Sequence, residues 1–167
     1  ELLERHEFMG KQAADLEAAR ENLMAMIHEM DVTMTRQFKE AFEEIRGYFA
    51  DIFVRLFGGG KAELFLTDEK DVLHAGVEIE VQLPAKKRQN LSVLSGGERA
   101  LTVIALLFSF LRYRPAPFSV LDEIDAPLDE ANVSRFGKFL GEFAENTQFI
   151  VVTHRKGTME ASDFMYG

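Results

Sequence analysis

The first third of the chain has apolar residues at the spacing of a long amphipathic helix. Leu16, Leu23 and Met30 recur every seven residues, which is the spacing of a coiled-coil seam. A second seam with related spacing is formed by Phe38, Phe42, Ile45, Phe49, Ile52 and Leu56. Because residues 1–57 contain no proline, we predict one helix, whose N-terminal part needs a partner helix from another segment or chain. The alternative is a helix that lies on its own domain.

Short strands are expected after this helix. Three glycines at residues 58–60 end it, because glycine readily adopts the left-handed conformation found at helix ends. Residues 62–66 and 77–83 are predicted strands. In the second, apolar residues alternate with Glu and Gln, which is the pattern of a half-buried strand. An acidic turn at residues 68–71 separates the two strands, and we expect them to form a small antiparallel portion of the fold.

The second half of the chain alternates helices with apolar strands. A helix is predicted from Ser95 to about Arg112, and its apolar middle indicates that it is buried. Residues 118–121 and 149–152 are continuous apolar segments typical of buried strands, and the amphipathic helix 130–144 lies between them. Such a βαβ unit requires a parallel strand pair and a right-handed crossover. We therefore predict an α/β fold with a parallel sheet, flanking helices and the small antiparallel portion.

Composition and charge exclude several classes of function. The 167 residues include 19 basic and 28 acidic ones, a net charge of −9, which excludes an autonomous electrostatic binder of nucleic acid. Any nucleic-acid contact must use a local basic patch. The absence of cysteine excludes disulfide scaffolds, thiolate zinc sites and thiol catalysis, and suits a reducing compartment. We expect no signal peptide and no membrane span, and the abrupt start suggests a fragment of a longer protein.

Residues 94–98 have the sequence Leu-Ser-Gly-Gly-Glu at the predicted start of a helix. Ser95 and Glu98 have the spacing of a capping box. Gly96 and Gly97 each cost roughly 1 kcal/mol relative to alanine in a helix, so their presence needs another explanation. Glycine lets another group approach the backbone closely, and a helix N-terminus with bare N–H groups and a serine hydroxyl binds phosphate. The alternative is an ordinary capped helix with flexible glycines.

Two adjacent carboxylates follow the first apolar strand, at the sheet edge where open α/β sheets bind ligands. Asp122 can hold Mg²⁺ directly or through water, and Glu123 can polarise a water molecule. His154 follows the second strand, so parallel pairing brings it to the same edge. The alternatives are an acidic surface turn and an ordinary loop histidine. Asp125 and Asp129 continue the acidic run, and Asp129 is placed to cap the following helix.

Local clusters of basic residues stand out in this acidic chain. The largest is formed by Lys86, Lys87 and Arg88, which follow the second predicted strand. Smaller clusters are Arg112 with Arg114 and Arg155 with Lys156. Composition favours solvated loop charge for all of them.

The sequence contains no G-x-x-x-x-G-K-[ST] phosphate loop, the Walker A motif. The glycines at residues 58–60 precede Lys61, but Ala62 stands where the motif requires Ser or Thr. Arg55 stands where the motif requires its first glycine. We therefore do not interpret this segment as a phosphate-binding loop.

Four motifs, in this order and at this spacing, resemble those of the ABC-type ATPases. Residues 94–98 match the signature motif, and His154 matches the switch histidine. Asp122 and Glu123 match the Walker B motif. The D-loop is matched by Ala126, Pro127, Leu128 and Asp129. More narrowly, the segments LSGGERALTVIALLF, PAPFSVLDEIDAPLDEANVSRF and TQFIVVTHRKGTME resemble the structural maintenance of chromosomes (SMC) family, of the bacterial condensin type. One departure is Ala85, where that family often has glycine.

The resemblance implies a division into two parts. Residues 1–47 correspond to the end of a coiled-coil arm. Residues 48–167 correspond to the C-terminal lobe of an ABC-type ATPase head, and the segment FGGGKAEL fits the entry of the arm into the head. In this family the phosphate loop lies in a separate N-terminal lobe. The C-terminal lobe alone is therefore expected to be inactive as an ATPase.

The resemblance also implies roles for individual residues. Two heads enclose two ATP molecules, and Ser95, Gly96 and Gly97 of one head contact the γ-phosphate of ATP held by the other. Leu94 and Glu98 complete the signature motif. Asp122 supports Mg²⁺ in its own head, and Glu123 is the general base for the attacking water. His154 contacts the γ-phosphate, and Asp129 communicates across the dimer.

The implied cofactors are ATP and Mg²⁺. The implied partners are the N-terminal lobe of the same head, a second SMC head in a homodimer, a kleisin subunit and DNA. The DNA backbone would be contacted by Lys86, Lys87 and Arg88. No membrane partner is expected, because the chain has no apolar span. The implied setting is the cytoplasm, at the nucleoid, in chromosome condensation and segregation. Three alternatives stay open. They are another ABC-type ATPase of transport or DNA repair, a non-enzymatic coiled-coil docking module, and a self-contained Mg²⁺-dependent phosphohydrolase that uses Asp122, Glu123, Asp129 and His154.

Overall fold

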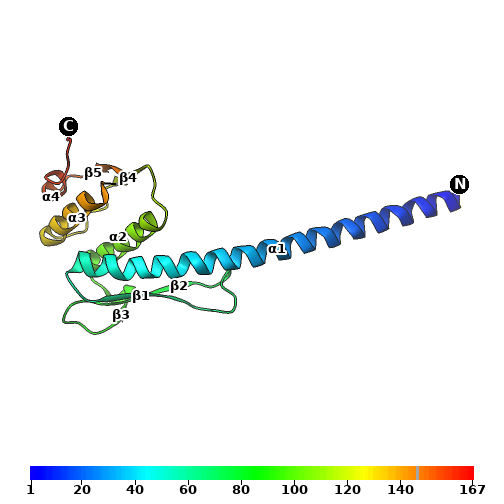
Figure 1. Cartoon of the computed structure of the whole chain (residues 1–167), viewed down its shortest axis with the longest axis horizontal. Helices are drawn as coiled ribbons and strands as arrows, with labels where there is room; N and C mark the ends of the chain where they lie inside the picture. Colours follow the sequence, from blue (N-terminus) through cyan, green and yellow to red (C-terminus); the bar gives the residue numbers. More distant parts are fainter. Residues whose placement is uncertain (146) are drawn as a thin grey trace. The chain divides into compact units, whose positions relative to one another are not determined.

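The computed structural model describes residues 1–145 and 147–167, apart from the side chain of residue 4. The chain divides into two compact units, residues 1–40 and residues 41–167. Helix α1 (Leu2–Phe57) begins in the first unit and ends in the second (Figure 1). The predicted boundary between arm and head, at residues 47–48, lies further along the same helix and stays a prediction. No helix in the described ranges is long and apolar enough to cross a membrane.

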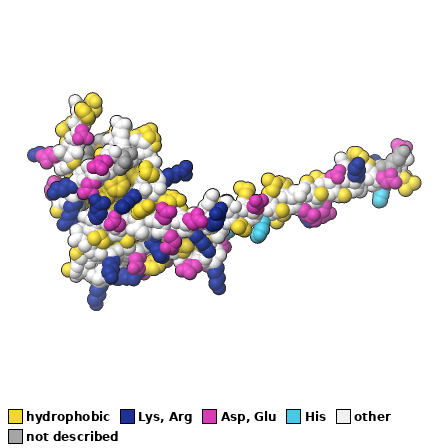
Figure 2. All heavy atoms as spheres, in the orientation of Figure 1, with side chains coloured by type: hydrophobic (Ala, Val, Ile, Leu, Met, Phe, Trp, Pro, Cys, Tyr) yellow, Lys and Arg dark blue, Asp and Glu magenta, His cyan; other side chains and the backbone are white. Residues whose placement is uncertain are grey.

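The first unit is helical, and its described residues include no buried side chain. Leu16, Leu23 and Met30 of the first predicted seam are 72%, 60% and 60% exposed. Apolar side chains recur along the surface of this segment in Figure 2. A single helix cannot bury its own apolar stripe. The first seam is thus exposed in this chain, and its pairing with a partner helix stays a prediction from the coiled-coil spacing.

From Ile45 onward, the second seam belongs to the core of the second unit. Phe49 and Ile52 are fully buried, and Leu56 is 1% exposed. One turn apart on the same helix, Phe53 stacks on Phe57 with ring centroids 4.2 Å apart. One long helix thus carries two apolar stripes with different surroundings, the first exposed and the second packed against its own domain.

A three-stranded antiparallel sheet follows α1, with the strand order β1-β2-β3. Its strands are β1 (Lys61–Leu66), β2 (Val77–Gln82) and β3 (Gln89–Asn90). Ala62 pairs with Val81 and Leu64 with Ile79, which places the buried side chains of β1 and β2 on one face. The two predicted strands and the antiparallel portion are confirmed. Strand β3 was missed because two residues are too few to show a pattern.

Two turns beside this sheet have a left-handed backbone. Gly60 has φ +89°, and a Cβ at this position would lie 2.3 Å from the carbonyl oxygen of Gln82, so only glycine fits. Ala85, in the loop between β2 and β3, has φ +61°. This conformation is unfavourable for alanine and free for glycine. The backbone therefore explains why glycine suits this position in the family that the sequence resembles.

The rest of the second unit contains the predicted βαβ unit. The elements after the antiparallel sheet are η1 (Leu91–Val93), α2 (Gly96–Tyr113), β4 (Phe118–Asp122), α3 (Glu130–Phe143), β5 (Gln148–Val152) and α4 (Lys156–Met159). Of these, β4, α3 and β5 form the βαβ unit. Strands β4 and β5 are parallel, with Leu121 opposite Val151 and Asp122 opposite Val152. The parallel pair and the α/β fold class are confirmed. The short helices η1 and α4 were not predicted.

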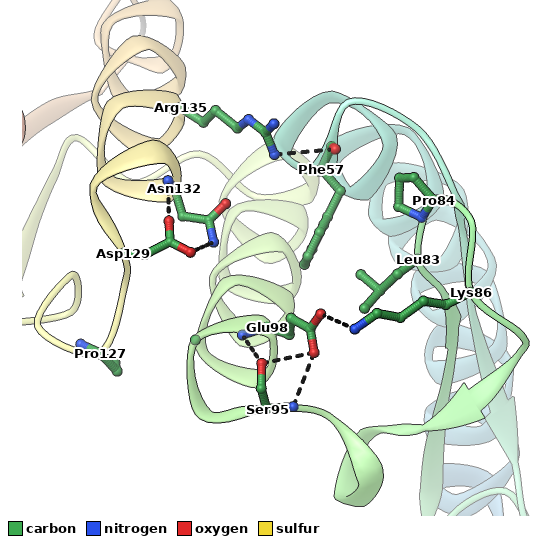
Figure 3. A pocket seen from close by; sticks show the side chains of 11 residues that line it. Phe57, Leu83, Pro84, Lys86, Ser95, Glu98, Pro127, Asp129, Asn132 and Arg135 are labelled. Carbon is green, nitrogen blue, oxygen red and sulfur yellow. Dashed lines mark hydrogen bonds and ion pairs between the residues drawn. The ribbon is translucent and has the colours of Figure 1, made fainter.

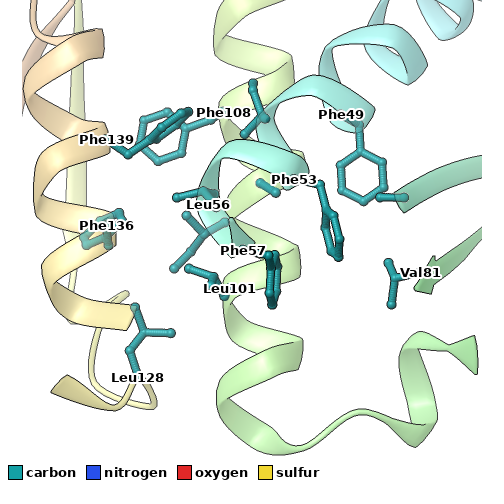
Figure 4. Close-up of a cluster of buried hydrophobic side chains, with 14 of the residues drawn as sticks. Phe49, Phe53, Leu56, Phe57, Val81, Leu101, Phe108, Leu128, Phe136 and Phe139 are labelled. Atoms are coloured by element: carbon teal, nitrogen blue, oxygen red, sulfur yellow. The ribbon is translucent and has the colours of Figure 1, made fainter. Parts of the chain in front are cut away.

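Phenylalanines fill the core where α1, α2 and α3 meet (Figure 4). Phe108 of α2 is fully buried. Its ring lies edge-on to those of Phe136, Phe139 and Phe143 of α3, with ring centroids 4.9–6.3 Å apart. Edge-to-face pairs of this kind are favourable beyond the area that they bury. This packing holds α2 and α3 together, and with them the motifs at their N-termini.

One face of the β4–β5 pair is open to solvent. Its side chains are 50–59% exposed and belong to Phe118, Val120, Ile150 and Val152. On α2, Val103 and Phe110 are 47% and 51% exposed. The prediction that these strands and this helix are buried on all sides is therefore wrong for one face of each. Contiguous exposed apolar surface of this kind marks an interaction site, which agrees with a lobe that packs against further strands.

Candidate functional site

The predicted signature motif begins α2 with a complete capping box (Figure 3). Ser95 is the N-cap, and its hydroxyl oxygen accepts a hydrogen bond from the backbone N–H of Glu98 at 3.4 Å. The backbone N–H of Ser95 donates to Glu98 Oε2 at 3.1 Å, and the Ser95 hydroxyl donates to the same oxygen at 2.8 Å. The predicted helix start is confirmed. The reciprocal hydrogen bonds hold the first turn rigidly at the edge of the domain.

Lys86 is paired with this cap. Its ammonium donates to Glu98 Oε1 at 2.7 Å. This bond is the largest of the causes that shift the pKa of the Glu98 carboxyl below its ordinary value. Partial burial acts in the opposite direction, and the hydrogen bonds from Ser95 lower the pKa further. Glu98 therefore stays ionised, and a residue of the predicted basic cluster is tied to the signature helix.

Replacing Glu98 by Gln is expected to destabilise the chain at pH 7 by about 0.5 kcal/mol, because the amide keeps the cap but loses the charge paired with Lys86. Because folding lowers the pKa of the Glu98 carboxyl from its ordinary value of 4.5, the ionised carboxylate stabilises the folded state at pH values above 4.5. That stability is lost as the pH falls through the folded-state pKa. Thermal melts of both proteins are expected to differ at pH 7 and to converge at more acid pH.

The matched control for this measurement is Lys86→Met, in which Glu98→Gln should have a smaller effect because the main partner of the carboxylate is gone. An offset between wild type and Glu98→Gln that keeps its full size far below pH 4.5 would contradict the assignment.

The two glycines of the signature motif have different surroundings. A Cβ at Gly97 would lie 3.1 Å from the carbonyl oxygen of Pro127 in the predicted D-loop. A Cβ at Gly96 would meet no atom within 4 Å. Gly97 is therefore explained by close packing inside this chain. Gly96 leaves the N-terminus of α2 open to a group from outside, as a phosphate site requires.

A pocket of about 490 Å³ lies beside this helix N-terminus (Figure 3). Ser95 of the signature motif and Asp129 of the D-loop both line it, although they are far apart in the sequence. Two cationic side chains, Lys86 and Arg135, also line it, and Arg135 donates to the carbonyl oxygen of Phe57 at 3.3 Å. The pocket combines hydroxyl, amide, cationic and carboxylate groups, and its two carboxylates, Glu98 and Asp129, already accept hydrogen bonds inside the chain. Its polar lining can bind the phosphate and hydroxyl groups of a ligand.

The predicted D-loop connects β4 to α3. The Asp129 carboxylate caps α3 by accepting hydrogen bonds from the Asn132 backbone N–H at 2.8 Å and its side-chain amide at 3.2 Å. The predicted capping role is confirmed. Leu128 is 3% exposed and belongs to the core, whereas Ala126 and Pro127 are exposed. Leu128 thus anchors the loop, and its neighbours are available to another molecule.

The two carboxylates and the histidine meet at one sheet edge, as parallel pairing predicts. Glu123 Oε1 lies 3.7 Å from His154 Nδ1, and both side chains are more than 60% exposed. The backbone N–H of Glu123 donates to the carbonyl oxygen of Val152 at 2.9 Å. Glu123 has φ +46°, a left-handed conformation that is uncommon for a glutamate. Strain of this kind concentrates at functional sites.

Asp122 is an exposed carboxylate at the end of β4, directly before Glu123. Within residues 1–145 and 147–167, no group of three His, Asp or Glu side chains could hold a metal ion. Mg²⁺ bound to a nucleotide commonly takes only one or two protein carboxylates, with phosphates and waters as its other ligands. The residues present therefore fit a nucleotide-bound Mg²⁺ and do not form an all-protein cage.

The sequence reading missed a buried polar cluster behind the site. Asp125 is fully buried, and its Oδ2 accepts hydrogen bonds from the hydroxyls of Thr153 and Thr158. Arg155 is not a solvated loop charge, which corrects the prediction from composition. Its side chain is 21% exposed, donates to the carbonyl oxygen of Leu128 at 2.7 Å and pairs with Glu130 at 3.1 Å. The sequence shows only that one Asp and two Thr lie close to the predicted motifs, and this does not predict that their side chains meet.

Several of the other basic residues also have partners inside the chain. Arg88 bridges Glu63 and Glu80 on the antiparallel sheet and lies over the ring of Phe65. Arg112 pairs with Asp51 at 2.6 Å. For Lys87, no ion pair is found within the described residues. Contact between residues 86–88 and DNA stays a prediction, and in two of the three the charge is already matched inside the chain.

A family model for the RecF/RecN/SMC N-terminal domain matches residues 5–167 of this chain. The chain belongs to this family. Its relatives include the chromosome partition protein Smc of Bacillus subtilis (strain 168), 58% identical over 164 residues. Another is the chromosome partition protein Smc of Desulfitobacterium hafniense (strain Y51), 53% identical over 166 residues. The matches cover 98% and 99% of this chain but 14% of each relative, so the chain spans about a seventh of their length.

Solved structures of the SMC family have the same fold. A chain from a structural study of ATP-driven dimerization and DNA-stimulated activation of SMC ATPases is 38% identical, with a TM-score of 0.75. The match covers 80% of this chain and 81% of that one. The Smc head domain of Pyrococcus furiosus, bound to the C-terminal domain of ScpA, is 39% identical with a TM-score of 0.76. Here the match covers 89% of this chain and 37% of that one. The predicted family and fold class are confirmed.

Proposed function

We propose that this SMC-family chain is the C-terminal lobe of the ATPase head of a bacterial chromosome partition protein. The observation that supports the proposal is an incomplete set of motifs. The sequence matches the signature motif, the paired carboxylates, the D-loop and the switch histidine of ABC-type ATPases, whereas the 167 residues contain no phosphate-loop motif. An N-terminal lobe supplies the missing loop. The two lobes together bind and hydrolyse ATP, and ATP-driven engagement of two heads moves the coiled coils that act on DNA.

In this proposal, each residue of the sheet edge has one task. The Asp122 carboxylate holds Mg²⁺, which neutralises phosphate charge when bound. Glu123 accepts a proton from the water that attacks the γ-phosphorus. Its Oε1 lies 3.7 Å from His154 Nδ1, so one water or phosphate oxygen at this edge has both groups within reach. His154 contacts the γ-phosphate, which fixes the direction of attack.

The signature helix acts on the ATP of the opposite head. Ser95 presents its hydroxyl, and the first turn of α2 presents backbone N–H groups beside the open position of Gly96. Such a helix N-terminus favours a phosphate oxygen through its unpaired N–H groups and its dipole. Asp129 lines the same pocket and communicates between the two sites.

The partners follow from the surfaces that this lobe leaves open. The exposed apolar face of β4 and β5 packs against the N-terminal lobe, and the exposed seam of residues 1–40 pairs with the returning helix of the coiled coil. A kleisin subunit binds the head in this proposal, which is supported by the structure of a related Smc head bound to the C-terminal domain of ScpA. DNA is the substrate that the coiled coils entrap, and the cytoplasm at the nucleoid is the setting.

The test is Mg²⁺-dependent ATP turnover by this chain alone and after co-expression with the N-terminal lobe of the same head. Turnover is expected only in the assembled head, because the chain alone has no phosphate loop to bind the nucleotide. Turnover by the chain alone would instead support the self-contained phosphohydrolase, in which Asp122, Glu123, Asp129 and His154 act within one molecule.

A further inference from the structure

Asp125 is a buried carboxylate that joins three segments around the proposed site. Its exposed fraction is 0%. Its Oδ2 accepts hydrogen bonds from the hydroxyl of Thr153, at 2.7 Å, and from the hydroxyl of Thr158. Asp125 lies between β4 and α3, Thr153 directly follows β5, and Thr158 belongs to α4. One carboxylate therefore ties the segment that carries His154 to the segment that carries Glu123.

Arg155 makes a second link between the same segments. Its guanidinium donates to the carbonyl oxygen of Leu128 at 2.7 Å, and its backbone N–H donates to the hydroxyl oxygen of Thr153 at 2.9 Å. The Thr153 hydroxyl thus donates to Asp125 and accepts from Arg155. His154 stands between two residues that are both held in place. We call Asp125, Thr153, Arg155 and Thr158 the anchoring cluster.

The His154 side chain has little support of its own. It is 64% exposed, and its Nδ1 is 3.7 Å from Glu123 Oε1, beyond hydrogen-bond distance. Within the described residues, the imidazole makes no other polar contact. The position of the imidazole is therefore set by its backbone, and the backbone on both sides is set by the anchoring cluster.

The close approach of α4 to α3 brings Thr158 to Asp125. A Cβ at Gly157 would lie 2.9 Å from Val133 Cγ1, and a Cβ at Gly137 would lie 3.1 Å from the carbonyl oxygen of Gly157. The two helices therefore meet at glycine on both sides. Larger side chains at these positions would separate α4 from α3 and lengthen the bond from Thr158.

Stability alone is a poor reason for such a cluster. A buried carboxylate is expensive to desolvate, and well-packed apolar side chains of similar volume are often as stable or more stable. In the described part of the chain, Asp125 Oδ1 and Arg155 Nε are buried without a hydrogen-bond partner, which adds to that cost. What the hydrogen bonds supply instead is direction, because they hold two loops in one geometry.

We propose that Asp125 and Thr153 are positioning residues that hold His154 in register with Glu123 for ATP hydrolysis. The inference rests on the proposed function, because the register affects a rate only in a head that hydrolyses ATP. Neither residue touches the nucleotide. Both act through the backbone of residues 153–155, which carries His154.

The test uses Thr153→Val in the head assembled with its N-terminal lobe, because valine keeps the shape and removes the hydroxyl. The ATPase kcat is expected to fall about tenfold, since small misplacement of a reacting group is costly. The KM for ATP is expected to stay within twofold, because the N-terminal lobe holds most of the nucleotide. Thr153→Ser keeps the hydroxyl and should restore kcat. A lower Tm with unchanged kcat in Thr153→Val would overturn the proposal in favour of a purely structural role.

A double-mutant cycle with His154→Ala tests whether Thr153 acts through the histidine. In the His154→Ala head, Thr153→Val is expected to cause no further loss of kcat, because the residue that it positions is gone. An equal tenfold loss in both backgrounds would show that Thr153 acts independently of His154, and the proposal would be abandoned.

Hydrogen exchange of the assembled head gives a readout that does not depend on turnover. Backbone amides of residues 153–158 are expected to exchange faster in Thr153→Val than in wild type or Thr153→Ser, because the bond from the Arg155 N–H is lost. Unchanged exchange would overturn the anchoring role even in an active head. A wild-type head without Glu123-dependent turnover would refute the proposed function instead, while the exchange result would still decide the anchoring.

Discussion

Glu123→Gln is expected to lower the ATP turnover of the assembled head by about 10²- to 10⁴-fold, the usual contribution of a general base, and to leave ATP binding intact. Glutamine is nearly isosteric with glutamate, so the left-handed backbone at this position and its bond to Val152 are retained. What is lost is the basic oxygen that lies 3.7 Å from His154 Nδ1. A nucleotide that binds but is not hydrolysed should keep two heads engaged.

The measurement pairs steady-state ATP hydrolysis with size-exclusion chromatography in ATP. The variant is expected to elute as an engaged dimer where the wild type returns to monomer. Glu69→Gln is the matched control, because this exposed residue lies in the turn between β1 and β2, away from the site. Turnover of Glu123→Gln within a factor of two of the wild type would rule out Glu123 as the base.

Ser95→Arg is expected to abolish ATP-dependent engagement of two heads while ATP binding by each head persists. In the proposed dimer, the phosphate of the opposite head would enter the open space at Gly96, and the arginine side chain would occupy that space. The substitution also removes the N-cap of α2, which costs about 1 kcal/mol. That cost is small against the free energy of a domain, so the fold is expected to survive.

Ser95→Ala separates the two effects of this substitution. Alanine removes the cap as arginine does, but it leaves the space open, so Ser95→Ala heads should still engage in ATP, with weaker affinity. Thermal melts of the two variants should be alike. ATP-dependent dimers of Ser95→Arg at wild-type affinity would show that the signature helix does not receive the phosphate of the opposite head.

The assembled head is also the setting in which the exposed apolar surfaces of this lobe are understood. Phe118 and Val120 on β4 and Ile150 and Val152 on β5 are exposed. The side chains that alternate with them are buried or partly buried, and they belong to Ser119, Leu121, Phe149 and Val151. The sequence pattern of β4 and β5 is continuously apolar, which is typical of strands covered on both sides. In the proposed head, the N-terminal lobe would cover the exposed face of these strands, which would reconcile their continuously apolar pattern with their exposure in this chain.

Much of the local structure was determined by the sequence, because it depends on residues close together along the chain. The capping box needs only Ser95 and Glu98, three residues apart, and the cap of α3 needs only Asp129 and Asn132. The convergence of Glu123 and His154 was also predictable, because a βαβ unit brings the ends of both its strands to one edge.

The anchoring of the site was decided only by the tertiary structure. Asp125 meets its two threonines from 28 and 33 residues away, and Arg155 reaches back across 27 residues to Leu128. In the sequence, nothing distinguishes Asp125 from the other acidic residues around it, or Arg155 from other charged loop residues. Asp125 is fully buried and Arg155 is partly buried, and a polar group removed from water must find its partner among the few groups packed against it.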